Sequence, residues 1–259
     1  MKILFFGASE LGYDCCECLI ENNTEIVGIF TIPQHYSIKF KDEKELIVLN
    51  NVNFKDFNEL GKKYHIPVTT VEGKMTEHLQ YIKDLKPDLI LVIGWYYMIP
   101  ESIMSIPPKG AIGIHASLLP KYRGNAPLVW AIINGEKETG ISLFYFDKGV
   151  DTGDIIAQKK FVINDTDTIK EVLEKTKECS IQILIENIPL LQNNKAPRFV
   201  QDHTQATIFP KRTPKDGEID WAMSPKQIKN FIRAQTKPYP GAFTYINEKK
   251  ITIWDADVE

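Results

Sequence analysis

Two residues that could exchange protons, His115 and Asp151, each follow an apolar stretch in this 259-residue sequence. His115 closes the run AIGIH, and the turn-forming stretch ASLLPKYRG comes directly after it. Asp151 stands 36 positions later, between Gly149 and Gly153, in a loop after the next apolar run. A carboxylate beside an imidazole fixes its tautomer and stabilises its charged form. The pair is therefore a candidate for proton transfer, provided that the fold brings the two side chains together.

Each of the two residues also has a purely structural interpretation. A lone histidine on an apolar strand can be a satisfied core residue, and aspartate with glycine is common in solvated turns. The spacing favours a site, because a helix of about ten residues fits between the two strands and strands joined in this way usually neighbour one another. Their loops then open at one edge of the sheet, where α/β proteins bind ligands.

Alternating strand and helix patterns along the chain predict the fold that positions this pair. Apolar runs alternate with segments whose apolar residues recur at spacings of three and four, which is typical of a mostly parallel sheet wrapped by helices. Residues 34–55 show no firm period and predict a long loop or a small hairpin. The predicted strands are 2–6, 25–31, 66–71, 89–94, 111–115, 141–146 and 154–163, and the predicted helices are 10–22, 54–66, 76–88, one opened by Asn125 and closed at Gly135, and one from Thr168 onward.

The composition excludes several classes of protein. Hydrophobic residues make up 43% and charged residues 25% of the chain, as in ordinary globular enzymes. The net charge of −3 argues against capture of nucleic acid through its phosphates, and no apolar run approaches the roughly 20 residues of a membrane span. The cysteines of DCCEC point in different directions on a helix, so we expect reduced thiols in a cytoplasmic protein and no metal site. GASELG lacks the middle glycine of the dinucleotide-binding motif, which argues against NAD.

Three motifs occur in order, HASLLPKYRGNAP, WAIINGEKETG and DKGVDTGDII, and they begin at His115, Trp130 and Asp147. Together they resemble the formyltransferase family that uses N10-formyltetrahydrofolate, which includes methionyl-tRNA, glycinamide ribonucleotide and sugar-nucleotide N-formyltransferases. The resemblance covers essentially the whole chain and resumes at FPKRTPKDGEIDW and IRAQTKPYPGAF. These later motifs, and R-G-x-A-P, resemble the tRNA and sugar branches rather than the purine branch.

The resemblance implies a Rossmann-like catalytic domain, N10-formyltetrahydrofolate as the cofactor, and transfer of its formyl group to an amine. It implies that His115 acts as general base or as charged stabiliser, while Asp151 orients it. The family has an asparagine two positions before the histidine, which donates to the developing oxyanion, and this sequence has Gly113 there. Losing one such donor costs on the order of 10²- to 10³-fold in turnover.

Gly113 therefore leaves three interpretations open. We favour a deliberate replacement of asparagine; the others are a natural variant in which water or a backbone N–H substitutes, and an impaired protein that binds more than it catalyses. If the chain is a sugar-nucleotide formyltransferase, Gly113→Asn is expected to raise its turnover.

The resemblance also implies binding residues. The loop after strand 89–94 lines the family's pterin pocket, which assigns Trp95, Met98 and Ile99 to folate, with Asp147 and Val150 from the facing loop. A nucleotide-linked acceptor needs cations for its phosphates and a flat surface for its base. The candidates for acceptor binding are Ser9, Lys74, Arg123, Lys211, Arg212, Trp221, Arg233 and Tyr239.

The sequence thus predicts a Rossmann-like α/β domain over residues 1–195 and a small C-terminal domain over 196–259. The predicted activity is N-formylation of a nucleotide-linked amino sugar, such as a dTDP-4-amino-4,6-dideoxyhexose, for surface polysaccharide such as O-antigen. The short second module and the slightly acidic balance favour this acceptor over methionyl-tRNA, which is the alternative, beside a variant that only binds folate and sugar nucleotide. We also expect a cytoplasmic homodimer with no nucleic-acid or membrane partner.

Overall fold

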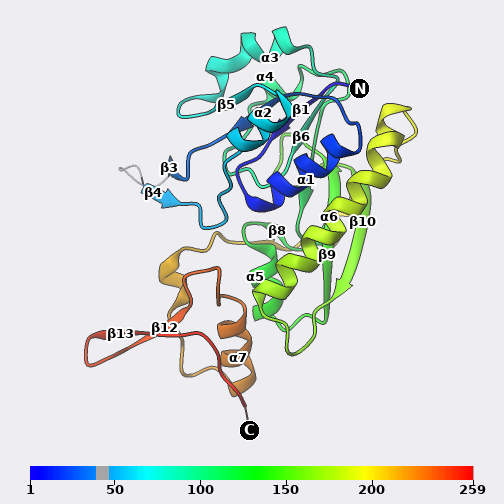
Figure 1. Ribbon diagram of the computed structural model, residues 1–259. Coiled ribbons are helices and arrows are strands. Elements are labelled where there is room, and N and C mark those ends of the chain that lie inside the picture. Colours follow the sequence, from blue (N-terminus) through cyan, green and yellow to red (C-terminus); the bar gives the residue numbers. More distant parts are fainter. Residues whose placement is uncertain (39–46, 259) are drawn as a thin grey trace. The chain divides into compact units, whose positions relative to one another are not determined.

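The computed structural model describes residues 1–38 and 47–258 (Figure 1). Seven strands form one sheet in the order β10-β9-β7-β6-β1-β2-β5, and the pairs β1–β2, β1–β6, β2–β5 and β6–β7 are parallel. This arrangement confirms the predicted α/β fold with its mostly parallel, Rossmann-like sheet. The strands are β1 (Ile3–Phe6), β2 (Ile26–Thr31), β5 (Val68–Thr70), β6 (Leu89–Val92), β7 (Ala111–His115), β9 (Glu138–Tyr145) and β10 (Ile155–Val162).

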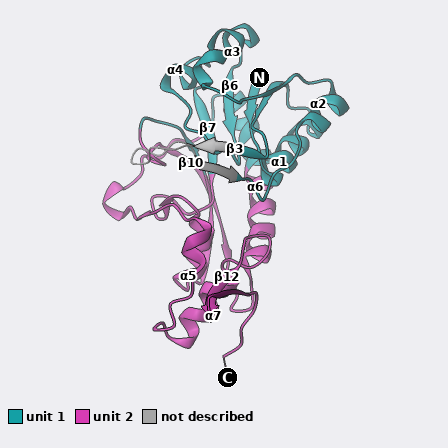
Figure 2. Ribbon diagram, turned by 90° about the vertical axis from the view of Figure 1, so that its left-hand side faces the viewer, with its two compact units in different colours: residues 1–114, 143–148, 184–196 teal, residues 115–142, 149–183, 197–259 magenta. Residues whose placement is uncertain are grey.

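Contacts divide the chain into two compact units, which Figure 2 colours separately. Unit 1 comprises residues 1–114, 143–148 and 184–196, and unit 2 comprises residues 115–142, 149–183 and 197–259. The predicted boundary between residues 195 and 196 stays a prediction. No helix among the described residues is long and apolar enough to span a bilayer.

The core of unit 1 follows from the alternation of side chains along its strands. On one face, Leu4 and Phe6 of β1 pack with Ile82 and Ile103 from the helices beyond. On the other face, Phe5 lies 6.1 Å from Phe57, measured between ring centroids. The helices of this unit are α1 (Glu10–Glu21), α2 (Asn58–Tyr64), α3 (Leu79–Leu85) and α4 (Glu101–Met104).

In unit 1 the structure decides between two alternatives for one segment and differs from the sequence prediction in another. The region without a firm period contains β3 (His35–Ile38) paired antiparallel with β4 (Ile47–Asn50), which confirms the hairpin alternative. Residues 39–46 lie outside the described residues. The predicted helix 76–88 begins as a 3₁₀ turn, Met75–His78, and becomes α-helical only over α3. Lys86 then ends it in the left-handed conformation, directly before Pro87.

Unit 2 begins with His115 and contains β8 (Arg123–Gly124), α5 (Pro127–Ile133) and most of α6 (Ile169–Gln192). The structure places the start of α5 differently from the prediction: Ala126, with φ of +52°, is the capping residue and makes no side-chain cap, while Asn125 accepts a bond from the Arg212 amide. One half of the predicted capping box of α6 is present, because Glu171 accepts bonds from the amide and hydroxyl of Thr168 at 2.8 and 2.6 Å. The Thr168 hydroxyl oxygen accepts from the Lys170 amide at 3.2 Å, one position before the expected partner.

The small C-terminal domain has its own core. Ile219, Phe231, Ile232 and Ala242 are buried together there. Its helix begins at Ser224, where a capping box with Gln227 satisfies the first amides of the helix. Its elements are β11 (Ile208–Phe209), which pairs with β8, α7 (Pro225–Arg233), and the hairpin of β12 (Ala242–Ile246) and β13 (Lys249–Ile253).

Candidate active site

The loop that follows His115 in unit 2 is held by its own hydrogen bonds. The Ser117 hydroxyl donates to the carbonyl oxygen of Lys121 at 2.6 Å. The Leu119 amide donates to the hydroxyl of Ser142, which in turn donates to the Ser117 carbonyl oxygen. The hydroxyls thus replace the pairing that the chain loses where β7 ends. The loop then returns to the imidazole at Tyr122.

The imidazole of His115 lies between two acceptors. Its Nε2 is 2.7 Å from the carbonyl oxygen of Tyr122, and its Nδ1 is 3.6 Å from Oδ2 of Asp151. Only 10% of the His115 side chain and 18% of the Asp151 side chain are exposed. The two residues therefore meet as the sequence predicted that they could, in a largely buried setting.

These distances fix the roles of the two ring nitrogens. A carbonyl oxygen can only accept a hydrogen bond, so Nε2 carries the proton of the neutral ring. Nδ1 is then the nitrogen that can take up a further proton. Its 3.6 Å separation from Asp151 is too long for a direct hydrogen bond but lies within ion-pair range. A cation formed at Nδ1 is therefore attracted to the carboxylate.

Asp151 is held in an unusual backbone conformation. Its φ is +54°, a region that aspartate tolerates better than most residues but that still costs energy. Its Oδ2 accepts a hydrogen bond from the Gly124 amide at 2.8 Å. Two further bonds reach this loop from Gln201, whose Nε2 lies 3.0 Å from the Asp151 carbonyl oxygen and 2.6 Å from that of Gly153. The surrounding structure therefore supports the strained residue from both sides.

Two partners of Asp151, Gln201 and the Gly124 amide, were not among the residues predicted from the sequence. Gly124 belongs to the R-G motif, which offered a signal in the sequence. Gln201 lies 50 positions beyond Asp151, after the stretch of linker composition, and no periodicity or motif points to it.

The place of the family's asparagine is filled in this chain by an aromatic ring of the same unit. A Cβ atom built on Gly113 would lie 2.5 Å from a ring carbon of Phe146 and 2.8 Å from the carbonyl oxygen of Val92. Both distances are shorter than van der Waals contact, so the site has no room for a side chain. The three interpretations of Gly113 stay open. The lack of room also means that Gly113→Asn alone is not expected to raise turnover.

Unit 1 holds most of the residues predicted for the folate pocket. Gly94, with φ of +63°, turns the chain after β6, and the Trp95 ring then packs edge-on to Phe6 and Tyr97 at centroid distances of 5.2 and 5.9 Å. The Trp95 Nε1–H is buried and has no partner among the described residues. Of the other residues predicted to bind folate, Met98 is 75% exposed, Asp147 is exposed, Ile99 is buried in the core, and Val150, in unit 2, is exposed.

Two of the arginines predicted to bind the acceptor, Arg212 and Arg233, form hydrogen bonds within the protein itself. Arg233 donates to the carbonyl oxygens of Asn164 and Asp167, and Arg212 donates to the Asp216 carbonyl oxygen and to Gln235. Burial lowers the pKa of both guanidinium groups from their ordinary value. Of the remaining candidates, Arg123 is buried, Ser9 caps α1, Tyr239 packs against α5 and α6, and Lys74, Lys211 and Trp221 are exposed.

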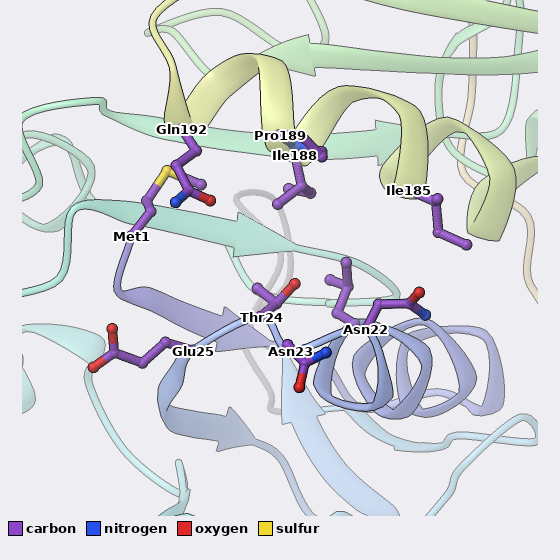
Figure 3. A pocket seen from close by; sticks show the side chains of 10 residues that line it. Met1, Asn22, Asn23, Thr24, Glu25, Ile185, Ile188, Pro189 and Gln192 are labelled. Carbon is purple, nitrogen blue, oxygen red and sulfur yellow. The ribbon is translucent and has the colours of Figure 1, made fainter.

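A cavity of about 340 Å³ in unit 1 lies elsewhere, at the amino ends of β1 and β2 (Figure 3). Met1, the turn from Asn22 to Glu25, and Ile188 and Gln192 of α6 line it. It is remote along these strands from the carboxyl-end loops, so it is not part of the candidate site. Among residues 1–38 and 47–258, no cluster of histidine, cysteine or acidic side chains is placed to hold a metal ion.

Comparisons with known proteins identify the family of the chain. Residues 1–188 match the family described as formyl transferase, and residues 211–259 match its C-terminal domain. The methionyl-tRNA formyltransferase of Alkaliphilus oremlandii is 38% identical over 259 residues, which cover the whole chain and 80% of that protein. The bifunctional polymyxin resistance protein ArnA of Wigglesworthia glossinidia brevipalpis is 36% identical over the whole chain and 38% of its own length.

Solved structures share the fold. An N-formyltransferase from Helicobacter canadensis, in complex with folinic acid and dTDP-3-aminofucose, superposes with a TM-score of 0.71 at 23% identity, over 97% of this chain and 86% of that one. The family matches cover most of the sequence, and the relatives match its full length. The chain belongs to the formyl transferase family.

Proposed function

We propose that His115 and Asp151 move the proton when this chain transfers a formyl group to an amine. Transfer of formyl from N10-formyltetrahydrofolate is the chemistry of the family. The observation that supports the roles is the imidazole itself, with Nε2 bonded to the Tyr122 carbonyl and Nδ1 facing Asp151. Nδ1 takes the proton that the attacking amine must lose, and the Asp151 carboxylate stabilises the resulting cation. The imidazolium would then give this proton to the folate nitrogen as its bond to the formyl carbon breaks, which returns His115 to its neutral form.

The residues at the end of β6 fit a folate. Trp95 offers a buried N–H without a partner among the described residues, beside aromatic and apolar surface. Such a surface suits a flat heteroaromatic ring with acceptor atoms on its edge. Trp95, Met98 and Asp147 would hold N10-formyltetrahydrofolate, which supplies the formyl carbon when bound. The role of Val150 stays a prediction.

The acceptor that the relatives support best is the amine of methionyl-tRNA. The 38% identity to a methionyl-tRNA formyltransferase extends over the whole chain, whereas the structure with an amino-sugar nucleotide is only 23% identical. This order reverses the ranking from the sequence, which placed the sugar nucleotide first and expected no nucleic-acid partner. We therefore propose methionyl-tRNA as the first acceptor to test.

A nucleotide-linked amino sugar is the second candidate. The chain carries 34 acidic against 31 basic residues, and its net charge of −3 does not supply the broad basic surface that nucleic acid attracts. Trp221 of the C-terminal domain is 59% exposed, and its ring offers a flat surface for a base. The homodimer and the cytoplasmic location stay predictions.

One experiment separates these acceptors. The purified chain is incubated with N10-formyltetrahydrofolate and either methionyl-tRNA or a panel of dTDP- and UDP-linked amino sugars, and product masses are recorded. Formylation of methionyl-tRNA alone supports the first proposal, and formylation of a sugar nucleotide alone supports the second. His115→Ala should lower either activity by at least about 100-fold, as loss of a general base does. Full activity in that variant would remove His115 from the mechanism.

A further inference from the structure

Gln201 connects a buried arginine to the loop that carries Asp151. Its side chain is 4% exposed, as is Arg123. On one side its Oε1 accepts a hydrogen bond from Arg123 Nη2 at 2.5 Å, and on the other its Nε2 reaches the carbonyl oxygens of Asp151 and Gly153. All four residues belong to unit 2.

The arginine determines which way the Gln201 amide points. A guanidinium group can only donate hydrogen bonds, so the oxygen of Gln201 must face Arg123. The amide nitrogen must then face the Asp151 loop, where both partners are carbonyl oxygens that can only accept. The amide therefore has one orientation that satisfies every partner.

Arg123 is a charged residue in a buried position, which packing alone does not explain. It has no acidic partner among the described residues: its Nη2 bonds to Gln201 and to Nδ1 of His203, and its Nε has no partner there. A buried charge without a carboxylate partner carries a desolvation penalty that an apolar residue avoids. This penalty indicates that Arg123 has a specific structural role. Its hydrogen bond to Gln201 provides that role.

The same segment also reaches the Asp151 side chain. Gly124, next to Arg123, donates its amide to Oδ2 of Asp151. Residues 123 and 124 thus restrain the aspartate twice, through Gln201 at its backbone and through Gly124 at its carboxylate. Both restraints act on a residue with φ of +54°, which relaxes to a lower-energy conformation unless it is held.

We infer that Gln201 is a positioning residue for formyl transfer, and that Arg123 sets its orientation so that the Asp151 carboxylate stays opposite Nδ1 of His115. This inference rests on the proposed function of the His115–Asp151 pair. Displacing a catalytic group by about 1 Å can cost about 100-fold in rate. Losing the Gln201 bonds should therefore lower kcat by about 10- to 100-fold, with little effect on substrate binding.

Gln201→Glu tests this inference with an isosteric change. The new carboxylate can pair with Arg123, which favours folding, but it turns an acceptor toward the two carbonyl oxygens of the loop. We expect kcat to fall about 10- to 100-fold on whichever acceptor is formylated, with the KM values of both substrates changed less than about 3-fold. Amide hydrogen exchange can be measured without any substrate. In the Asp151–Gly153 loop we expect the exchange rate to rise by about 10-fold.

Gln182→Glu is the matched control, because Gln182 is an exposed glutamine on α6 of the same unit and lies outside the Asp151 loop. It should leave both readouts unchanged. If Gln201→Glu fails to fold, Gln201→Met replaces it in the test. This variant also removes the side-chain N–H donors to the Asp151 loop, without adding charge, and we expect the same fall in kcat and the same rise in hydrogen exchange. A folded Gln201 variant with normal kcat and normal exchange would overturn the inference. His115→Ala and Asp151→Asn, measured alongside, distinguish that outcome from failure of the proposed function, in which these two variants would stay active.

Discussion

The contact between Gly113 and Phe146 allows a prediction about stability. A Cβ at residue 113 would lie 2.5 and 2.7 Å from two ring carbons of Phe146 and 2.8 Å from the Val92 carbonyl oxygen. Carbon atoms in contact normally stand about 3.5–4.0 Å apart, so a methyl group forces shifts of about 1 Å. Overpacking of this kind costs about 1–3 kcal/mol. Replacing glycine in a strand returns about 0.5–1 kcal/mol, so Gly113→Ala should destabilise the protein by about 1 kcal/mol, within a range of about 0 to 2.5 kcal/mol.

Urea unfolding and thermal melting measure this loss. For a chain of this size, 1 kcal/mol corresponds to about 2–4 °C in Tm. Gly28→Ala is the matched control in another strand of the same sheet, since a Cβ there would lie no closer than 3.2 Å to the ends of two leucine side chains. In a Phe146→Ala background, Gly113→Ala should cost about 1 kcal/mol less. The reasoning fails if Gly113→Ala is more stable than the parent, or if the two substitutions are additive.

The same contact governs attempts to restore an asparagine. Gly113→Asn alone should lower stability without raising kcat, because the ring of Phe146 already fills the space. Gly113→Asn combined with Phe146→Ala makes room for the amide. A higher kcat in the double variant than in Phe146→Ala alone would show that a donor at this position still assists the reaction.

Two other contacts in unit 2 allow predictions about stability. Arg233→Met should lower the free energy of unfolding in urea by about 2–3 kcal/mol, because the carbonyl oxygens of Asn164 and Asp167 lose their donor. Lys226 is exposed on the same helix, so Lys226→Met should leave the free energy of unfolding nearly unchanged. Burial and a hydrogen bond to Glu136 raise the pKa of Tyr122 to about 12 from its ordinary value of 10.0. The unfolded chain therefore loses this proton first, so the contribution is complete below pH 10 and disappears as pH rises toward 12. Urea midpoints between pH 9 and 12 should fall more steeply for the parent than for Tyr122→Phe, and equal slopes would contradict the assignment.

Much of the fold could be predicted from local patterns. The apolar runs 2–6, 25–31 and 89–94 contain β1, β2 and β6, because strands buried on both faces are continuously apolar. Helix ends were harder to predict. The segment 54–66 is helical only over Asn58–Tyr64, and Ala126 rather than Asn125 precedes α5. Such boundaries depend on which backbone groups find partners elsewhere in the fold, and a residue pattern does not contain that information.

The sequence by itself indicated that His115 ends one strand and that Asp151 lies in the loop after the next one, because apolar periodicity and turn residues are local properties of the chain. Only the tertiary structure decided that Nε2 bonds to the Tyr122 carbonyl, that Gln201 restrains Asp151 from 50 positions away, and that Phe146 fills the space beside Gly113. Directional hydrogen bonds and steric contacts depend on positions within a few ångströms. Those positions are set by packing between segments that are distant in the sequence.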